Sequence, residues 1–140
     1  MANKLTILVD LNIVLDVMRN RQPFYEESAR VLDSAVRREV TGLLAAHSVT
    51  TLFYVLTRSR NRETATAAIT SLLDAFSIAK LDDAVIGKAL SWDCVDFEAA
   101  VQMAAAVFAD ADYLVTRNRR DFQEGIIPVV QPSAFLTLLD

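Results

Sequence analysis

Apolar residues follow two different spacings along this chain, and the two spacings alternate from its beginning to its end. Short runs of consecutive apolar residues are typical of strands buried on both faces. Longer segments in which apolar residues recur every three or four positions are typical of amphipathic helices. We expect strands within 5–12 (ending at Asp10), 42–46, 76–79, 113–116 and 126–130, and helices over 13–20, 24–39, 49–58, 63–74, 84–90, 97–108 and 133–139.

This alternation of strands and helices predicts βα units and therefore a parallel sheet between two layers of helices. The fold class is α/β: a three-layer α/β/α arrangement with a parallel four- to five-stranded sheet. Pro128 places the last strand at an edge of that sheet, because proline cannot donate to a central ladder. Ser48 is expected to cap the helix over 49–58. With 140 residues and no repeat or linker, we expect residues 1–140 to form a single domain.

The first strand ends abruptly in a carboxylate, Asp10. Open α/β sheets bind their ligands at the carboxyl ends of their strands. A carboxylate that loses water without gaining a partner costs free energy, so Asp10 should meet a metal ion, a helix N-terminus or a phosphoryl group. The strand therefore marks a candidate site.

A second strand end carries polar residues of the same kind, namely Thr116, Asn118 and Asp121. If the chain starts in the middle of the sheet and winds outward in both directions, this strand and the first flank one crevice. Asp96, at the mouth of the helix over 97–108, and Glu98 just beyond it could point into the same crevice.

Carboxylates without histidine or cysteine suit a hard cation such as Mg²⁺ or Mn²⁺. Such ions activate water and neutralise phosphate, and they relieve the repulsion among clustered carboxylates. Each acid also has a structural interpretation. Asp10 or Asp96 would cap a helix, and the helix dipole alone favours Glu98 in a first turn.

Two further acids have local cationic partners in the sequence. Asp121 could pair with Arg117 or Arg120, and Asp16 is expected to face solvent or to pair with Arg19. The clusters of arginine within 58–62 and 117–120 either rim the crevice and hold a phosphate backbone or form a solvated surface.

The composition narrows the classes of function. A net charge of −4 argues against a strongly basic nucleic-acid binder, but not against an enzyme that acts on nucleic acid through metal ions. One histidine, His47, and one cysteine, Cys94, argue against a zinc site, and a lone cysteine suits the reducing cytoplasm. We interpret His47 as a hydrogen-bonded residue at a strand end. No apolar run of about 18 residues predicts a membrane span.

Three segments resemble the motifs of PIN-domain proteins, in order and over nearly the whole chain. They are VDLNIVLD at 9–16 (followed by Arg21 and Pro23), DFEAAVQ at 96–102 and DYLVTRNRRDF at 112–122. Within that family the chain is most similar to the VapC-like toxins of bacterial toxin–antitoxin pairs.

The resemblance implies a Mg²⁺- or Mn²⁺-dependent ribonuclease with an RNA substrate and a small antitoxin as its protein partner. Asp10 would be the first metal ligand, and Thr116 would orient it from the neighbouring strand. Asp121 would close the site together with Asn118, and Asn12 would support the loop at Asp10.

The chain departs from the family pattern at two positions. No Asp or Glu occurs between residues 39 and 63, where relatives usually carry a glutamate, and Ala99 stands where relatives often carry an aspartate. Fewer acids should weaken metal binding. The expected metal ligands are then Asp10, Glu98 and Asp121, with Asp96 as the alternative to Glu98.

These departures keep a second hypothesis open: a catalytically weakened or inactive PIN-like module that binds RNA or protein. A phosphoaspartyl protein with Asp10 as nucleophile is a third. The phosphatase version usually requires a second aspartate where Asn12 stands, and the receiver version requires a late lysine, whereas none follows Lys88. The amphipathic helices also suggest a homodimer.

Overall fold

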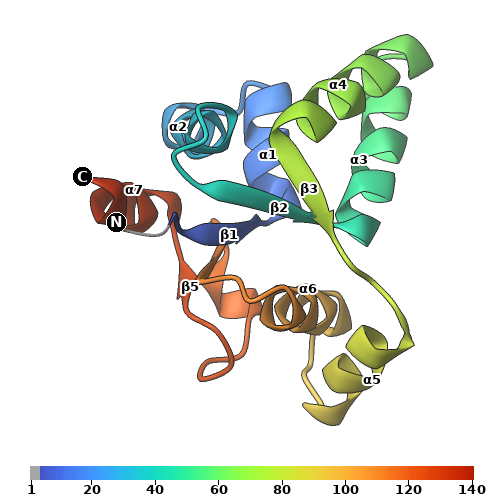
Figure 1. The fold of residues 1–140 in the computed structure, drawn as a ribbon. Coiled ribbons are helices and arrows are strands. Elements are labelled where there is room, and N and C mark those ends of the chain that lie inside the picture. The colour runs from blue at the N-terminus through green and yellow to red at the C-terminus, as the bar shows by residue number, and fades with distance from the viewer. Residues whose placement is uncertain (1–3) are drawn as a thin grey trace.

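A five-stranded parallel sheet lies at the centre of the molecule, with helices on both sides (Figure 1). The computed structural model describes residues 4–140. Its elements are β1 (Thr6–Val9), α1 (Leu11–Met18), α2 (Tyr25–Val36), β2 (Thr41–Ala45), α3 (Ala46–Ser59), α4 (Arg62–Ala75), β3 (Phe76–Ala79), α5 (Asp83–Ser91), α6 (Phe97–Phe108), β4 (Tyr113–Val115), a 3₁₀ turn (Arg119–Asp121), β5 (Val129–Val130) and α7 (Pro132–Leu139). The predicted three-layer α/β fold is confirmed.

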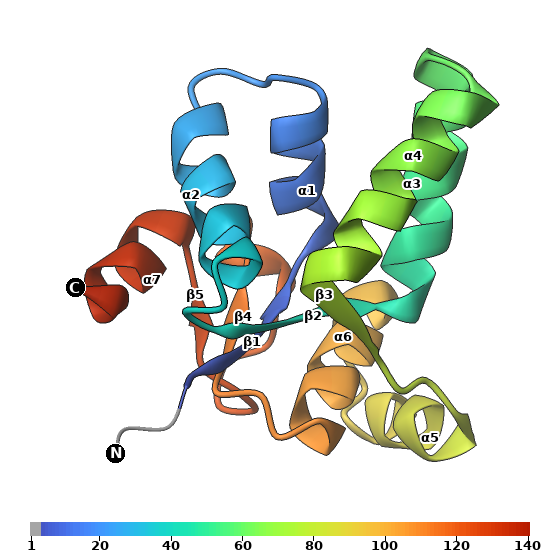
Figure 2. The ribbon, with the colours of Figure 1, turned by 45° about the horizontal axis from the view of Figure 1, so that its top comes forward.

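The two faces of the sheet bury separate clusters of apolar side chains. Side chains along a strand point alternately to opposite faces, so Ile7 and Val9 pack with α1 to α4 and α7, while Leu8 packs with α5 and α6. Figures 1 and 2 show α1 to α4 on one side of the sheet and α5 and α6 on the other. Because both faces are covered, the central strand β1 is apolar from Ile7 to Val9, which explains why it was recognisable in the sequence.

The strand order is β3-β2-β1-β4-β5, so the chain begins in the middle of the sheet and winds outward in both directions. β1 pairs in parallel with both β2 and β4. Beyond the strands, the backbone N–H of Asp10 still donates to the carbonyl of Val115 at 2.9 Å. The two strand exits therefore lie side by side at the switch point, as the sequence predicted.

Ser48 does not cap a helix, contrary to the sequence prediction. α3 begins at Ala46, directly after β2, because the extended backbone of Ala45 already serves as its N-cap. Ser48 consequently lies in the first helical turn and is buried.

The helix predicted over 24–39 ends at Val36. Arg38 adopts a left-handed conformation with φ of 63°, and the N–H of Glu39 turns back to the carbonyl of Ser34 at 2.9 Å. This is a common helix ending, but glycine or asparagine usually marks it in a sequence. Arg38 gives no such signal.

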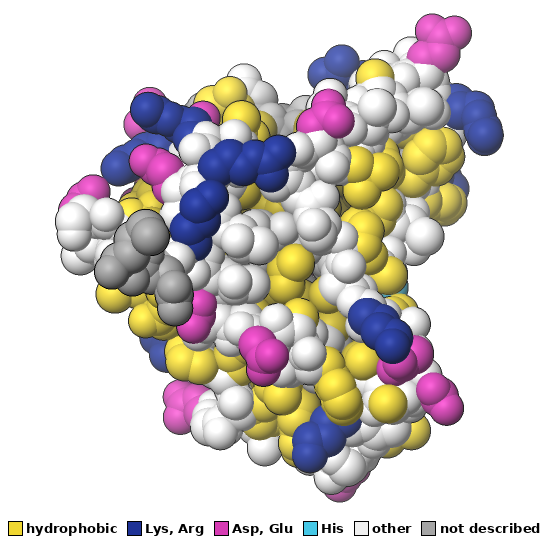
Figure 3. Space-filling view, in the orientation of Figure 1, with side chains coloured by type: hydrophobic (Ala, Val, Ile, Leu, Met, Phe, Trp, Pro, Cys, Tyr) yellow, Lys and Arg dark blue, Asp and Glu magenta, His cyan; other side chains and the backbone are white. Residues whose placement is uncertain are grey.

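The surface in Figure 3 carries basic and acidic side chains interspersed with hydrophobic ones. Tyr54 of α3, Leu73 of α4 and Leu90 of α5 are each more than half exposed. Within residues 4–140, no helix has the length and apolar character needed to cross a membrane.

Candidate active site

A pocket of about 210 Å³ opens at the carboxyl ends of β1 and β4. Four of the predicted acids line it: Asp10, Asp96, Glu98 and Asp121. The pocket is also lined by Leu11, Asn12, Leu15, Ser48, Ala99, Gln102 and Phe122. Asp10 thus shares one small volume with acids that follow it by more than 80 residues in the sequence, and we call this volume the acidic pocket.

Asp10 is held in place by two neutral donors. The hydroxyl of Thr116 donates to its Oδ2 at 2.7 Å, and the amide Nε2 of Gln102 donates to its Oδ1 at 3.1 Å. Thr116 is fully buried, and its Oγ1 in turn accepts from the backbone N–H of Asn118 at 3.0 Å and from the amide of Asn12 at 3.5 Å. Asp10 occupies the N-cap position of α1 with an extended backbone, but its side chain forms no hydrogen bond to the helix, and only such a bond would explain why a carboxylate stands there. The capping interpretation of Asp10 is therefore wrong.

Asp96 does cap a helix, because its Oδ1 accepts from the backbone N–H of Ala99 at 3.0 Å. It lines the acidic pocket at the same time, so the structural and functional interpretations hold together for this residue. Glu98, in the first turn of α6, is exposed, and its Oε1 lies 3.9 Å from Nε2 of His47. Nε2 of His47 is buried without a hydrogen bond from residues 4–140, so the expectation of a hydrogen-bonded His47 is wrong.

Asp121 lies in the 3₁₀ turn after β4 and is exposed, and among residues 4–140 its carboxylate forms no ion pair. The predicted partner Arg117 turns elsewhere. The side chain of Asn118 does not line the acidic pocket. It lines a neighbouring hollow with Arg117, Arg119 and Arg120. The structure brings Asp121 and Asp10 to one pocket, and the backbone N–H of Asn118 donates to Oγ1 of Thr116, the residue that holds Asp10.

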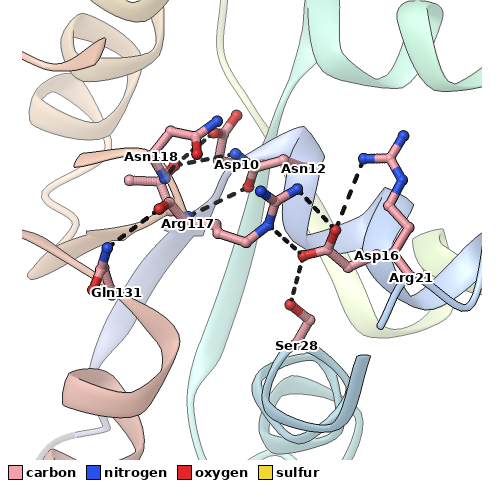
Figure 4. Close-up of polar contacts among 9 residues, drawn as sticks. Asp10, Asn12, Asp16, Arg21, Ser28, Arg117, Asn118 and Gln131 are labelled. Carbon is pink, nitrogen blue, oxygen red and sulfur yellow. Dashed lines mark hydrogen bonds and ion pairs between the residues drawn. The ribbon is translucent and has the colours of Figure 1, made fainter. Parts of the chain in front are cut away.

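Arg117 instead forms the buried polar cluster in Figure 4. Its Nε and Nη2 donate to the two carboxylate oxygens of Asp16 at 2.9 and 3.0 Å, and Ser28 Oγ donates to Oδ2 at 3.0 Å. Arg21 adds a longer ion pair at 3.8 Å, and the guanidinium of Arg117 lies 4.0 Å from the ring centroid of Phe24. Asp16 is completely buried, so the prediction that it faces solvent or pairs with Arg19 is wrong.

The sequence analysis did not predict the buried contacts of Asp16 and Gln102, although the sequence pattern indicated each of them. Asp16 follows Ile13 by three residues, which puts it on the apolar face of α1, where an unpaired acid would be costly. Gln102 is an amide within the alanine-rich α6, where eight consecutive residues from Ala99 to Ala106 are buried. In both cases a polar residue at a core position indicated a specific partner.

Each polar side chain that lines the acidic pocket carries at least one oxygen atom, and none is a histidine or cysteine, which suits a hard cation. Within residues 4–140, however, no three Asp, Glu, His or Cys side chains stand close enough together to hold an ion directly. Mg²⁺ is often bound through one or two carboxylates with water as the remaining ligands. The carbonyl Oε1 of Gln102, beside Asp10, is buried and lacks a hydrogen-bond partner in the described chain. The site therefore fits a largely hydrated cation, and not a cation enclosed by protein ligands.

A family model described as PIN domain matches residues 6–120, which is most of the chain and includes Asp10, Thr116 and Asn118 but ends just before Asp121. The chain belongs to the PIN domain family. The family resemblance seen in the three sequence motifs is therefore confirmed. A comparison with curated protein sequences finds no match.

Solved structures of toxin–antitoxin systems share the fold. VapBC-1 from nontypeable Haemophilus influenzae superposes with a TM-score of 0.70 at 15% identity, covering 92% of this chain and 99% of that one. A toxin–antitoxin complex from Klebsiella pneumoniae gives 0.69 at 19% identity, covering 90% and 97%. Mycobacterium tuberculosis VapC20, a toxin that cleaves the sarcin–ricin loop, gives 0.63 at 15%, covering 77% and 86%. At these identities the likeness establishes the fold.

Proposed function

We propose that this PIN domain is a Mg²⁺- or Mn²⁺-dependent endoribonuclease and the toxin of a toxin–antitoxin pair. One observation carries the proposal: Asp10, Asp96, Glu98 and Asp121 converge on a single pocket at the topological switch point. Four carboxylates that line one pocket repel one another, which costs free energy unless a cation or a helix N-terminus offsets the repulsion. Of the four side chains, only that of Asp96 caps a helix.

In the proposed site, Asp10 and Asp121 are the anchoring metal ligands. Glu98, or Asp96 in its place, is the third acid and acts on the cation directly or through a bound water. Thr116 fixes the carboxylate of Asp10, so that little rearrangement is needed when the cation binds. A bound Mg²⁺ or Mn²⁺ would supply an activated water and neutralise charge on the scissile phosphate.

A hollow next to the acidic pocket, lined by two arginines and by Glu124, supports RNA as the substrate. Arg119 and Arg120 line a hollow of about 770 Å³, and Phe122 lines both this hollow and the acidic pocket. Arginine binds phosphate oxygens well because its planar guanidinium can donate two hydrogen bonds at once. The proposed RNA backbone thus runs from the two arginines past Phe122 to Asp10.

The proposed protein partner is a small antitoxin, in keeping with the toxin–antitoxin complexes that share the fold. A cytoplasmic location, a homodimer and a single domain over residues 1–140 stay predictions. α7 lies beyond the matched residues but contributes Phe135 to the core, which supports the single domain.

Cleavage of a 5′-labelled single-stranded RNA, with Mn²⁺ or with EDTA, tests the proposal. We expect cleavage only with the metal. We expect Asp10→Asn to lower the rate by more than about 100-fold, since even outer partners of metal ligands are worth about 10–100-fold. Asp33→Asn, which changes an exposed aspartate of α2, is the matched control. Equal cleavage by wild type and Asp10→Asn would contradict the proposal.

A non-catalytic module that binds RNA or protein is the second candidate. It is favoured by the lack, within residues 4–140, of three acids close enough to hold an ion, and by Ala99 on the pocket wall. Calorimetric titration with Mn²⁺ separates the two functions. Heat of binding below millimolar metal supports the nuclease, whereas salt-sensitive RNA binding without any metal binding supports the module.

A further inference from the structure

The amide of Gln102 forms a hydrogen bond through its nitrogen, but its oxygen has no partner within residues 4–140. The residue is 6% exposed, and its Nε2 donates to Oδ1 of Asp10 at 3.1 Å. Its Oε1 is buried and accepts no hydrogen bond from any residue of the described range 4–140. A buried carbonyl without a donor is uncommon in native proteins, so this oxygen requires an explanation.

The orientation of the amide follows from its neighbour. A carboxylate offers only acceptors, so the amide must turn its N–H group toward Asp10. The reverse orientation would set the carbonyl oxygen against the carboxylate oxygen, which is repulsive. The carbonyl is therefore the free end. Because both atoms are bonded to one carbon, the carbonyl lies beside the Asp10 carboxylate.

The neighbouring carboxylates make the position of the Gln102 carbonyl electrostatically unfavourable unless a cation is present. Gln102 lines the acidic pocket together with Asp10, Glu98 and Asp121. The negative end of an amide dipole added to carboxylates raises the negative potential of the pocket further. The arrangement becomes favourable when a cation, or a water bound to a cation, accepts the lone pair of the carbonyl.

We propose that Gln102 is an oxygen ligand, directly or through one bound water, of a divalent cation anchored by Asp10 and Asp121. Amide carbonyls are ordinary ligands of hard cations. Nε2 of Gln102 orients Asp10 while Oε1 turns toward the cation, so one side chain serves both the metal and its first ligand. Gln102 thus supplies a neutral oxygen to a site that is short of acids. The inference rests on the metal site of the proposed function.

Mn²⁺ affinity, measured by calorimetry and by the electron paramagnetic resonance of free Mn²⁺, tests the inference without reference to RNA cleavage. Gln102→Met keeps the size of the side chain and removes both polar ends, so we expect affinity to fall by about 10–100-fold. Gln102→Glu keeps an oxygen and should match or exceed the wild-type affinity. Gln22→Met, at an exposed glutamine of the loop between α1 and α2, should leave affinity unchanged.

The outcomes separate this inference from the proposed function. Wild-type protein that binds no Mn²⁺ overturns both. Mn²⁺ binding that is equal in wild type and Gln102→Met overturns only the role of Gln102. If Gln102→Glu loses as much affinity as Gln102→Met, then Gln102 acts only as a donor to Asp10, and the ligand role is wrong. Thermal unfolding in EDTA establishes that each variant folds. Should Gln102→Met fail to fold, the affinity of Gln102→Glu decides alone.

Discussion

Asp10 and Asp16 lie six residues apart in the sequence, close to the same two strand exits, yet their surroundings differ sharply (Figure 4). Asp16 is completely buried, and both of its oxygens accept hydrogen bonds from the guanidinium of Arg117. Asp10 is partly exposed and receives only neutral donors, from Thr116 and Gln102. One carboxylate is electrically compensated and the other is not.

The difference indicates which acid is structural and which is available for chemistry. A compensated buried ion pair fixes the arrangement of the elements that supply it, here α1, α2 and the loop after β4. An uncompensated carboxylate next to other carboxylates keeps its capacity for a cation. The same comparison removes Arg117 from the predicted arginine rim, because its guanidinium is already engaged with Asp16. Arg119 and Arg120 remain exposed for a phosphate backbone.

The largest expected effect is on stability, at Asp16. Asp16→Ala leaves Arg117 partly buried without its partner, and we expect a loss of about 3–5 kcal/mol in the free energy of unfolding. Urea denaturation measures it. Asp33→Ala breaks the exposed Asp33–Arg37 pair and should cost less than about 1 kcal/mol. If the two variants lose equal stability, the ion pair between Asp16 and Arg117 does not hold the fold together, and Asp16 is not the structural acid.

Thr116→Val should have the next largest effect, because Thr116 joins the two regions. The substitution keeps the shape but removes the hydroxyl that serves Asp10 and the N–H of Asn118, so we expect a loss of about 1–3 kcal/mol in stability. Mn²⁺ affinity should fall as well, since the carboxylate of Asp10 is no longer oriented. Thr70→Val, at an exposed helical threonine, is the control. An unchanged Mn²⁺ affinity would separate Thr116 from the proposed metal site.

Asp10→Asn should change stability by less than about 1 kcal/mol, because the amide replaces one acceptor and removes a charge from a crowded acidic pocket. At the same time Mn²⁺ binding should be lost. Chemical denaturation in EDTA and calorimetry together check both parts. A destabilisation as large as that of Asp16→Ala would mean that Asp10 is also structural.

The smallest expected effect on stability is at Asp82, a half-buried carboxylate at the start of α5. The backbone N–H of Val85 donates to it at 3.0 Å, and this bond lowers the pKa of Asp82 below its ordinary value of 3.8. A lowered pKa in the folded state gives stability that is present above about pH 4 and is lost as the pH falls through the folded value. Asp82→Asn, which keeps the cap, should therefore be slightly less stable at pH 7 and equal to wild type near pH 2.

The fold could be predicted because each of its determinants is local. Apolar runs covered on both faces were recognisable without partners, and the order of the two polar strand exits implied the switch point. What could not be predicted depends on distant contacts. Nothing near Asp16 in the sequence indicates Arg117, which is 101 residues away. Likewise the neighbour of Gln102 is Asp10, 92 residues away. Ser48 failed as a cap because α3 follows β2 without a loop.

The central position of β1 has a consequence for the timing of synthesis. Asp10 is made early, but Thr116, which fixes it, follows 106 residues later. At about 5–20 residues per second, a ribosome needs roughly 5–20 s to bridge that interval. During this time the half of the sheet with β2 and β3 can form, while the acidic pocket still lacks β4. We expect nascent chains arrested before residue 113 to remain sensitive to protease around Asp10, and full-length chains to be protected there.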